Sequence, residues 1–126
     1  MPVAGLPRAA RLRRAADFAA LRHASGRLGG RCFHVRYQAN ALGYARLGLA
    51  ISKRVSKRAV ERNRIKRLVR ESFRRVRDQL PAVDLVVMAR EQAAGLPGTE
   101  LLAEIDALWR KLAPLKPADG AVTIAR

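Results

Sequence analysis

The residues best suited to chemistry in this sequence are cations spaced along residues 51–77. Twelve residues of this stretch are Lys or Arg, and only Glu61 and Glu71 oppose them. Stepped at about 100° per residue, four polar residues share one face: Asn63, Arg67, Arg70 and Arg74. The opposite third of the circle holds mostly apolar side chains: Ile65, Leu68, Val69, Ser72, Val76 and Leu80. Because a guanidinium donates paired hydrogen bonds to phosphate, this row of polar residues is suited to binding a polyanion.

A solvated surface helix is the alternative interpretation of this cationic face. Charged helix faces usually mix signs at i, i+4, whereas like charges repeat here at those spacings. Each such pair costs roughly a few tenths of a kcal/mol. The sequence therefore favours a helix that meets an external polyanion.

Groups for covalent or acid–base catalysis are few. His23 and His34 are the only histidines; with a lysine they could in principle cleave RNA, but surface or strand-facing histidines are the simpler interpretation. Cys32 beside His34 falls short of the four ligands, or three plus water, of a zinc site. There is no Gly-rich phosphate loop and no close carboxylate cluster. The sequence predicts a binding protein with no catalytic residue and no metal ligand of its own.

The positive charge is concentrated in the first two thirds of the chain. The formal net charge is +16; residues 1–80 carry 21 Lys/Arg against 4 Asp/Glu, and residues 81–126 carry 5 against 6. Such asymmetry indicates a binding surface rather than a solubility adaptation. Nucleic acid is the expected partner. An anionic membrane is the alternative, but the apolar side of the long helix is needed for the core.

The cysteine content and the hydropathy of the sequence indicate the cellular compartment of the protein. The single Cys32 excludes an internal disulfide framework and favours a reducing environment. No apolar run approaches about 18 residues, so no membrane span is expected, and the basic N-terminus lacks the apolar region of a secretory signal. We expect a cytoplasmic protein that acts on no small-molecule substrate.

Alternation predicts the strands. A very short strand is expected at Arg27–Leu28, and a longer one over Cys32–Ala39 with Phe33, Val35 and Tyr37 on one side and His34 and Arg36 on the other. Residues 44–51 continue as a further strand, expected to pair with Cys32–Ala39 as a hairpin. Val83–Ala89 is almost wholly apolar, as a strand buried on both faces would be.

Helical periodicity and capping residues predict three helices. The first runs from Ala15 to about His23, the long basic one begins after a Ser56 cap and ends before Pro81, and the last covers Thr99–Leu112. The expected class is α+β, with a small central β-sheet and packed helices. Residues 1–13 are expected to form a flexible basic arm, 14–113 a single domain and 114–126 a disordered tail.

The run Ala59–Phe73, AVERNRIKRLVRESF, closely resembles the RNR signature of the bacterial ribonuclease P protein subunit. Arg46–Arg54 resembles the family's strand and basic turn ahead of that helix, and Asp84–Arg90 its following strand. Phe18 resembles the aromatic of the family's first helix, and Leu108–Lys111 the end of its last helix. This ordered set covers about residues 11–112.

The resemblance implies an αβββαβα fold like domain 2 of ribosomal protein S5, with a βαβ unit that crosses over with the left hand, against the usual rule. It implies a protein partner of a catalytic RNA that removes the 5′ leader of precursor tRNA by metal-dependent hydrolysis. Magnesium is thus implied for the RNA–protein holoenzyme and not for the protein alone. A stand-alone RNA-binding or ribosome-associated protein is the alternative.

The resemblance also implies the site residues. The signature helix contacts the catalytic RNA through Arg62, Asn63, Arg64, Lys66, Arg67, Arg70 and Arg74, beside the preceding turn of Ser52, Lys53 and Arg54. A cleft between the first helix and the sheet holds the leader, with Phe18, Arg22, Phe33, Arg36 and Tyr37 as its candidates. Arg62 projects near the buried side of the helical wheel, so its alternative roles are to anchor the N-terminal turn or to reach toward the sheet.

Two positions depart from the family pattern. Arg22 and Arg36 stand where family members often carry aromatic residues. We therefore expect this cleft to hold leader phosphates more than bases.

Overall fold

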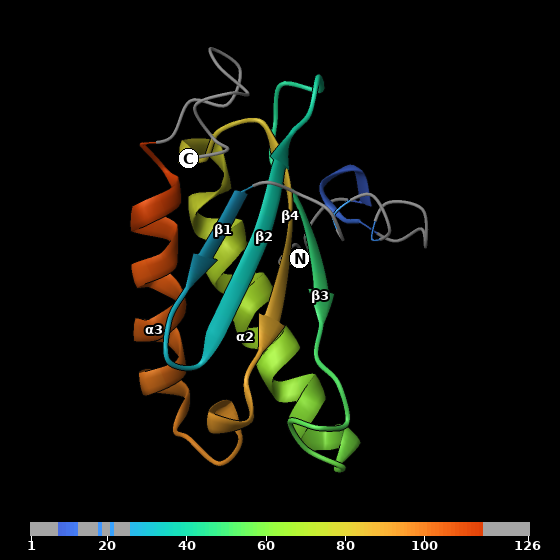
Figure 1. Ribbon diagram of the computed structural model, residues 1–126, viewed down its shortest axis with the longest axis vertical. Coiled ribbons are helices and arrows are strands. Elements are labelled where there is room, and N and C mark those ends of the chain that lie inside the picture. Colours follow the sequence, from blue (N-terminus) through green and yellow to red (C-terminus); the bar gives the residue numbers. More distant parts are fainter. Residues whose placement is uncertain (1–7, 13–17, 19–20, 22–25, 115–126) are drawn as a thin grey trace, which may run out of the picture.

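The structure, a computed structural model, describes residues 8–12, 18, 21 and 26–114. Its centre is a four-stranded sheet in the order β1-β2-β4-β3 (Figure 1). The strands are β1 (Gly26–Gly29), β2 (Phe33–Ala39), β3 (Arg46–Ala50) and β4 (Val83–Ala89). Each predicted strand is present, within one to two residues at its ends.

The strand pairing differs from the expected hairpin. β2 and β3 do not pair; β4 lies between them, antiparallel to β2 and parallel to β3. The composition of β4 explains its central place, since Leu85 and Val87 are fully buried on one face and Val86 is 6% exposed on the other. A strand with apolar side chains on both faces exposes the least apolar surface to water when it is paired along both edges and covered on both faces.

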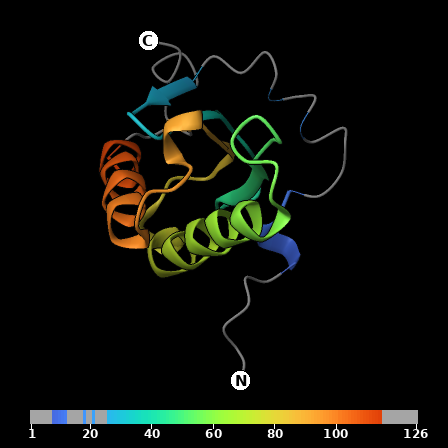
Figure 2. The same cartoon turned by 90° about the horizontal axis from the view of Figure 1, so that it is seen from below.

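Two helices cover one face of the sheet, α2 (Ala59–Val76) and α3 (Gly98–Leu112), which lie side by side (Figure 2). In Figure 1, β3 and β4 both point down and α2 passes behind them as the chain moves from β3 to β4. This βαβ crossover is left-handed, as the resemblance implies and against the usual rule.

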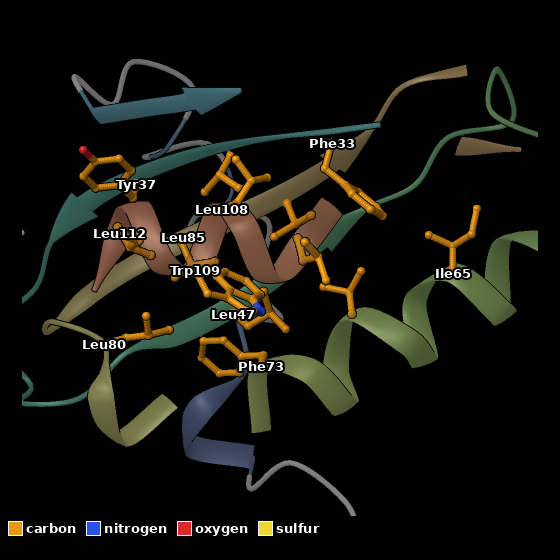
Figure 3. Close-up of a cluster of buried hydrophobic side chains, with 14 of the residues drawn as sticks. Phe33, Tyr37, Leu47, Ile65, Phe73, Leu80, Leu85, Leu108, Trp109 and Leu112 are labelled. Atoms are coloured by element: carbon orange, nitrogen blue, oxygen red, sulfur yellow. The ribbon is translucent and has the colours of Figure 1, made fainter. Parts of the chain in front are cut away.

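The core lies between that face and the helices. Figure 3 shows Phe33 reaching from the sheet, and Ile65 and Phe73 from α2, into one cluster. The Phe73 and Trp109 rings lie 5.8 Å apart at 59°. The polar groups at this junction are satisfied, because the Trp109 indole N–H donates to Ser72 Oγ at 2.7 Å and Ser72 donates to Asp106 at 2.7 Å. The predicted buried stripe of α2 is therefore confirmed.

Residues 8–12 pack against the domain, although they fall in the predicted basic arm. Arg8–Ala10 form a short 3-10 helix (η1), and Ala10 and Leu12 are almost fully buried. Arg11 bridges to Leu47 of β3 in a parallel sense, and the Leu12 N–H donates to the Leu47 carbonyl at 2.8 Å. This pairing covers the edge strand β3, whose backbone groups would otherwise stay open to another chain.

The helix caps also differ in detail. α2 begins at Ala59, and Ser56 instead accepts a hydrogen bond from the Arg58 N–H within the preceding turn. α3 begins at Gly98 with no side-chain cap, so Thr99 lies inside its first turn. After α2 a 3-10 turn (η2, Arg77–Gln79) leads to Pro81, as predicted. Of the expected Ala15–His23 helix only Phe18 and Leu21 are described, and both are helical. Most of the expected tail lies outside the described residues.

Among the residues that the structure describes, no helix combines the length and apolar character needed to cross a membrane.

Candidate RNA interface

The solvent side of α2 carries most of the predicted outward row, defined here as Asn63, Arg67, Arg70 and Arg74. The first three are exposed. Arg74 is half-buried and donates to Glu71 at 2.8 Å, and its buried Nε has no hydrogen-bond partner within the described part of the chain. The positions able to meet a partner without breaking an internal ion pair are therefore Asn63, Arg67 and Arg70.

Arg62 is an anchor of the loop before α2. Its guanidinium donates to the Ser56 carbonyl at 2.9 Å and to the Lys57 carbonyl at 3.0 Å. Both acceptors belong to the turn that leads into the helix. The structure thus favours the alternative role predicted from the helical wheel.

Replacing Arg62 by alanine is expected to lower the free energy of unfolding by about 1–2 kcal/mol, because two charge-assisted hydrogen bonds are lost at a half-exposed site. Lysine should recover part of the loss, because both hydrogen bonds come from one guanidinium nitrogen, Nη1, and the three N–H groups of an ammonium can donate to two carbonyls. Urea unfolding of the two variants measures this. A variant that keeps full stability but loses RNA affinity would instead make Arg62 an RNA contact.

Arg64 joins α2 to the loop before α3. It donates to Glu61 at 2.8 Å and to the Leu96 carbonyl at 3.0 Å, and Glu61 also accepts from the Gly95 N–H at 3.2 Å. The Arg64 hydrogen bond, with that of Gly95, holds the pKa of Glu61 below its ordinary value. Both arginines of the RNR triplet therefore have structural partners, while Asn63 between them is exposed.

A small cavity links α2 to the N-terminal segment. Its volume is about 180 Å³, and cationic and apolar side chains line it together: Arg11, Leu12, Phe18, Leu47, Leu49, Lys66 and Arg70. Although Arg70 presents much of its surface to solvent, partial burial of its guanidinium, with the charges of Arg11 and Arg67, lowers its pKa. The positive charge of these side chains favours an anion in this cavity.

The sheet face opposite α2 and α3, here called the second face, presents a cross-strand row of Arg27, Arg36, Val86 and Gly48. Phe18 lies over this face, because a Cβ on Gly48 would come within 2.8 Å of its ring. Phe18 is half-buried and packs with Leu12, Leu21, Val86 and Met88. Phe18 and Arg36 thus share one face, as the predicted leader cleft requires.

The placement of Phe33 and Tyr37 in that cleft is wrong. Phe33 is 0% exposed and Tyr37 4%, and both belong to the core on the helix-covered face. Strand alternation puts them opposite Arg36, and the Tyr37 ring fills the space where a Cβ on Gly26 would sit. Arg22 lies outside the described residues.

The turn before α2 lies beside a larger cavity, of about 800 Å³, at the end of β4. Ser52 and Arg54 line it with His34, Met88 and Arg90. Lys53 is exposed in the same turn. Sequence reasoning missed Arg90 and gave His34 no binding role. Two sequence signals indicated a site here: Arg90 directly follows β4, and His34 shares a strand face with Arg36.

His34 has no hydrogen-bond partner for its buried Nδ1 among the described residues. Burial, with the charges of Arg90 and Arg36, lowers the pKa of its imidazole. His23 lies outside the described residues, so the pairing of the two histidines stays a hypothesis.

No group of three or more His, Cys, Asp or Glu within the described part of the chain could hold a metal ion. The acidic groups near α2 are instead engaged with arginines, Glu61 with Arg64 and Glu71 with Arg74.

The sequence model of the family described as Ribonuclease P matches residues 6–113. This chain belongs to the ribonuclease P family. The ribonuclease P protein component of Chromohalobacter salexigens is 45% identical over 109 residues, which cover 86% of this chain and 85% of that relative. The ribonuclease P protein component of Thioalkalivibrio sulfidiphilus is 41% identical over 108 residues, covering 86% and 90%.

Solved structures of ribonuclease P proteins have the same fold. The protein from Staphylococcus aureus superimposes with a TM-score of 0.75 at 29% identity, covering 81% of this chain and 94% of that one. The protein from Thermotoga maritima gives a TM-score of 0.73 at 28% identity, covering 81% and 96%. The predicted α+β class is therefore confirmed.

Proposed function

We propose that this chain, as the protein subunit of a ribonuclease P, binds the catalytic RNA through the outward row of α2 and the 5′ leader of precursor tRNA across the second face of the sheet. The observation that carries the proposal is the arrangement of cations on two faces of one small domain. Arg67 and Arg70 project from α2, and Arg27 and Arg36 lie on the second face. The cavity formed by Phe18, Lys66 and Arg70 lies where the two meet.

The outward row suits a nucleic-acid backbone. From Asn63 to Arg74 the helix rises about 17 Å, which spans several phosphates. Guanidinium groups bind phosphate oxygens in pairs, and an Asn amide can bond a phosphate, a 2′-hydroxyl or a base edge. Since Arg62 and Arg64 serve the fold, we assign the main RNA contacts to Asn63, Lys66, Arg67 and Arg70.

The second face suits a single strand. Single-stranded RNA is held by cations along its backbone and by aromatic rings on which bases stack. Phe18 supplies the ring. Arg36 stands where family members often carry an aromatic residue, so this position offers a phosphate contact in place of a stacking contact. With Phe33 and Tyr37 in the core, stacking at this face depends on Phe18.

Catalysis and the metal are assigned to the RNA. The described residues include no group of three or more His, Cys, Asp or Glu placed to hold a metal ion, and we propose that magnesium is held by the RNA of the holoenzyme. The protein's part is to bind and orient.

Reconstitution tests this function. The full chain, combined with the catalytic RNA of its own cell, should restore removal of the 5′ leader from precursor tRNA at low magnesium concentration. RNA that co-purifies with the chain identifies the partner independently. Recovery of ribosomal RNA alone, with no stimulation of cleavage, would favour a ribosome-associated protein.

Replacing Phe18 by alanine is expected to reduce the preference for leader-bearing over leaderless tRNA by about 1–3 kcal/mol, the value of one aromatic–base stack. Assembly with the catalytic RNA should change little. Phe18→Leu is the matched control, since it keeps most of the apolar contact with Gly48 and Leu12 but removes the stacking ring. The two tRNA affinities and the melting temperature are measured for each variant.

The competing view is that Phe18 only packs. In that case the leucine variant should behave as wild type, and the alanine variant should melt early and lose both RNA partners together. Equal leader preference in the leucine variant and the wild type would contradict the stacking role.

A further inference from the structure

A groove between the C-terminal halves of α2 and α3 lies apart from both RNA faces. Its volume is about 280 Å³. Val76 and Leu80 contribute from the α2 side, and Leu102, Trp109 and Ala113 from α3. None of the outward row lines it. Ligand sites usually measure about 300–1,000 Å³, so this one has room for a single ring system.

The groove is also lined by the polar Ser72 and Gln79 and by one carboxylate, Asp106. Asp106 is half-buried and accepts a hydrogen bond from Ser72 Oγ at 2.7 Å. Ser72 itself accepts from the Trp109 indole N–H at 2.7 Å, which directs its hydroxyl proton toward Asp106. Among the described residues, no other hydrogen bond reaches Asp106. An ionised carboxylate has about four acceptor positions, so most of its capacity remains for a ligand.

The rim of the groove is cationic. Arg75 and Arg110 are exposed and line its opening, one from each helix. Arg75 lies 4.0 Å from Glu71, which is within ion-pair range but too long for a hydrogen bond. A ligand whose planar part enters the groove can therefore place an anionic group against these guanidinium groups.

Among the nucleobases, the Asp106 carboxylate favours guanine. A carboxylate accepts two parallel N–H bonds from one planar partner, and guanine offers adjacent N1–H and N2–H donors on one edge. Adenine and cytosine put a ring nitrogen acceptor beside their amino group, and uracil flanks its single N–H with carbonyls. Each of these would place a lone pair against the Asp106 carboxylate.

We propose that this groove binds a single guanine base through Asp106, with its phosphate at Arg75 and Arg110. The base comes either from a free guanine nucleotide or from an unpaired guanosine of an RNA. The proposal does not depend on the outward row or on the leader cleft.

Trp109 makes the test direct, because it is the only tryptophan of the chain and lines the groove. Titrating the full chain with guanosine 5′-monophosphate should change its fluorescence saturably. Adenosine and cytidine monophosphates should bind roughly tenfold or more weakly, the cost of one mismatched charged hydrogen bond.

Asp106→Asn is the matched variant. Its amide oxygen can still accept the Ser72 hydrogen bond, whereas its NH₂ group opposes the guanine N–H donors, so guanine affinity should fall roughly 10- to 100-fold. Arg110→Gln should weaken the monophosphate but leave guanosine unchanged. Lys111→Gln, outside the groove, should alter neither. An unchanged melting temperature for Asp106→Asn separates loss of binding from loss of fold.

A short oligoadenylate with one central guanosine distinguishes the two sources. Tighter Trp109-detected binding than that of the monophosphate, lost when the guanosine becomes adenosine, identifies RNA as the source; equal binding identifies the free nucleotide. The proposal is overturned if guanine and adenine nucleotides give the same response, or if Asp106→Asn binds guanine as wild type does.

Discussion

A chain in which Arg67 and Arg70 are both replaced by alanine is expected to bind the catalytic RNA roughly 10²- to 10⁴-fold more weakly, since each charge-assisted hydrogen bond contributes about 1–3 kcal/mol. Both side chains project from α2 away from its buried stripe. The loss should therefore appear in RNA affinity and not in folding. Burial of the Arg70 guanidinium, with the charges of Arg11 and Arg67, lowers its pKa. Removing Arg70 removes this unfavourable burial and repulsion, so the melting temperature should not fall.

Salt dependence provides the second measurement on this variant. Wild-type affinity should fall by orders of magnitude between about 50 and 200 mM monovalent salt, because each neutralised phosphate releases condensed counterion. The double variant should lose about two units of the logarithmic salt slope. Lys111→Ala, an exposed charge on α3, is the control and should change the slope little. A flat titration of the wild type, or equal losses in the control, would contradict the electrostatic interface.

The largest stability loss is expected for Phe73→Ala, at about 3–5 kcal/mol of unfolding free energy. Phe73 is 0% exposed and its ring packs against Trp109, so its removal leaves a cavity between the sheet, α2 and α3. A domain of this size is stabilised by only about 5–15 kcal/mol, which makes the predicted loss a large share. Denaturant unfolding measures it, with the slope of the transition as a check on cooperativity.

Two variants serve as controls for Phe73. Phe73→Leu keeps much of the volume and should cost less than alanine does, by about 1–2 kcal/mol or more. Val60→Ala, at a position 70% exposed, should cost close to nothing. A Phe73→Ala protein as stable as the Val60 variant would contradict the central place of this ring in the core.

Local periodicity was enough to predict several features of this protein. The buried stripe of α2 and the exposure of Asn63, Arg67 and Arg70 follow from a period of 3.6 residues, which depends only on the chain within the helix. The apolar run of β4 likewise predicted a strand buried on both faces, with the bounds that the structure has. The even alternation of β2 correctly separated Phe33 and Tyr37 from His34 and Arg36.

Features that depend on distant parts of the chain were predicted poorly. Alternation in β2 placed Phe33 and Tyr37 together but left open which side would meet the helices, so they were assigned to the cleft while the structure buries them. Arg62 and Arg64 look alike in the signature, yet the Ser56 and Leu96 carbonyls hold them to different loops. Such partners become visible only when the loops are placed.

The pairing of the strands is the clearest case. β2 and β3 are neighbours in sequence with a short turn between them, which favours a hairpin, but β4 enters between them after the whole of α2. The gain comes from burying both faces of β4, and that depends on the two helices and on β2 and β3 at once. A local sequence pattern does not predict this stabilisation, because the burial of β4 depends on segments that meet only in the folded chain.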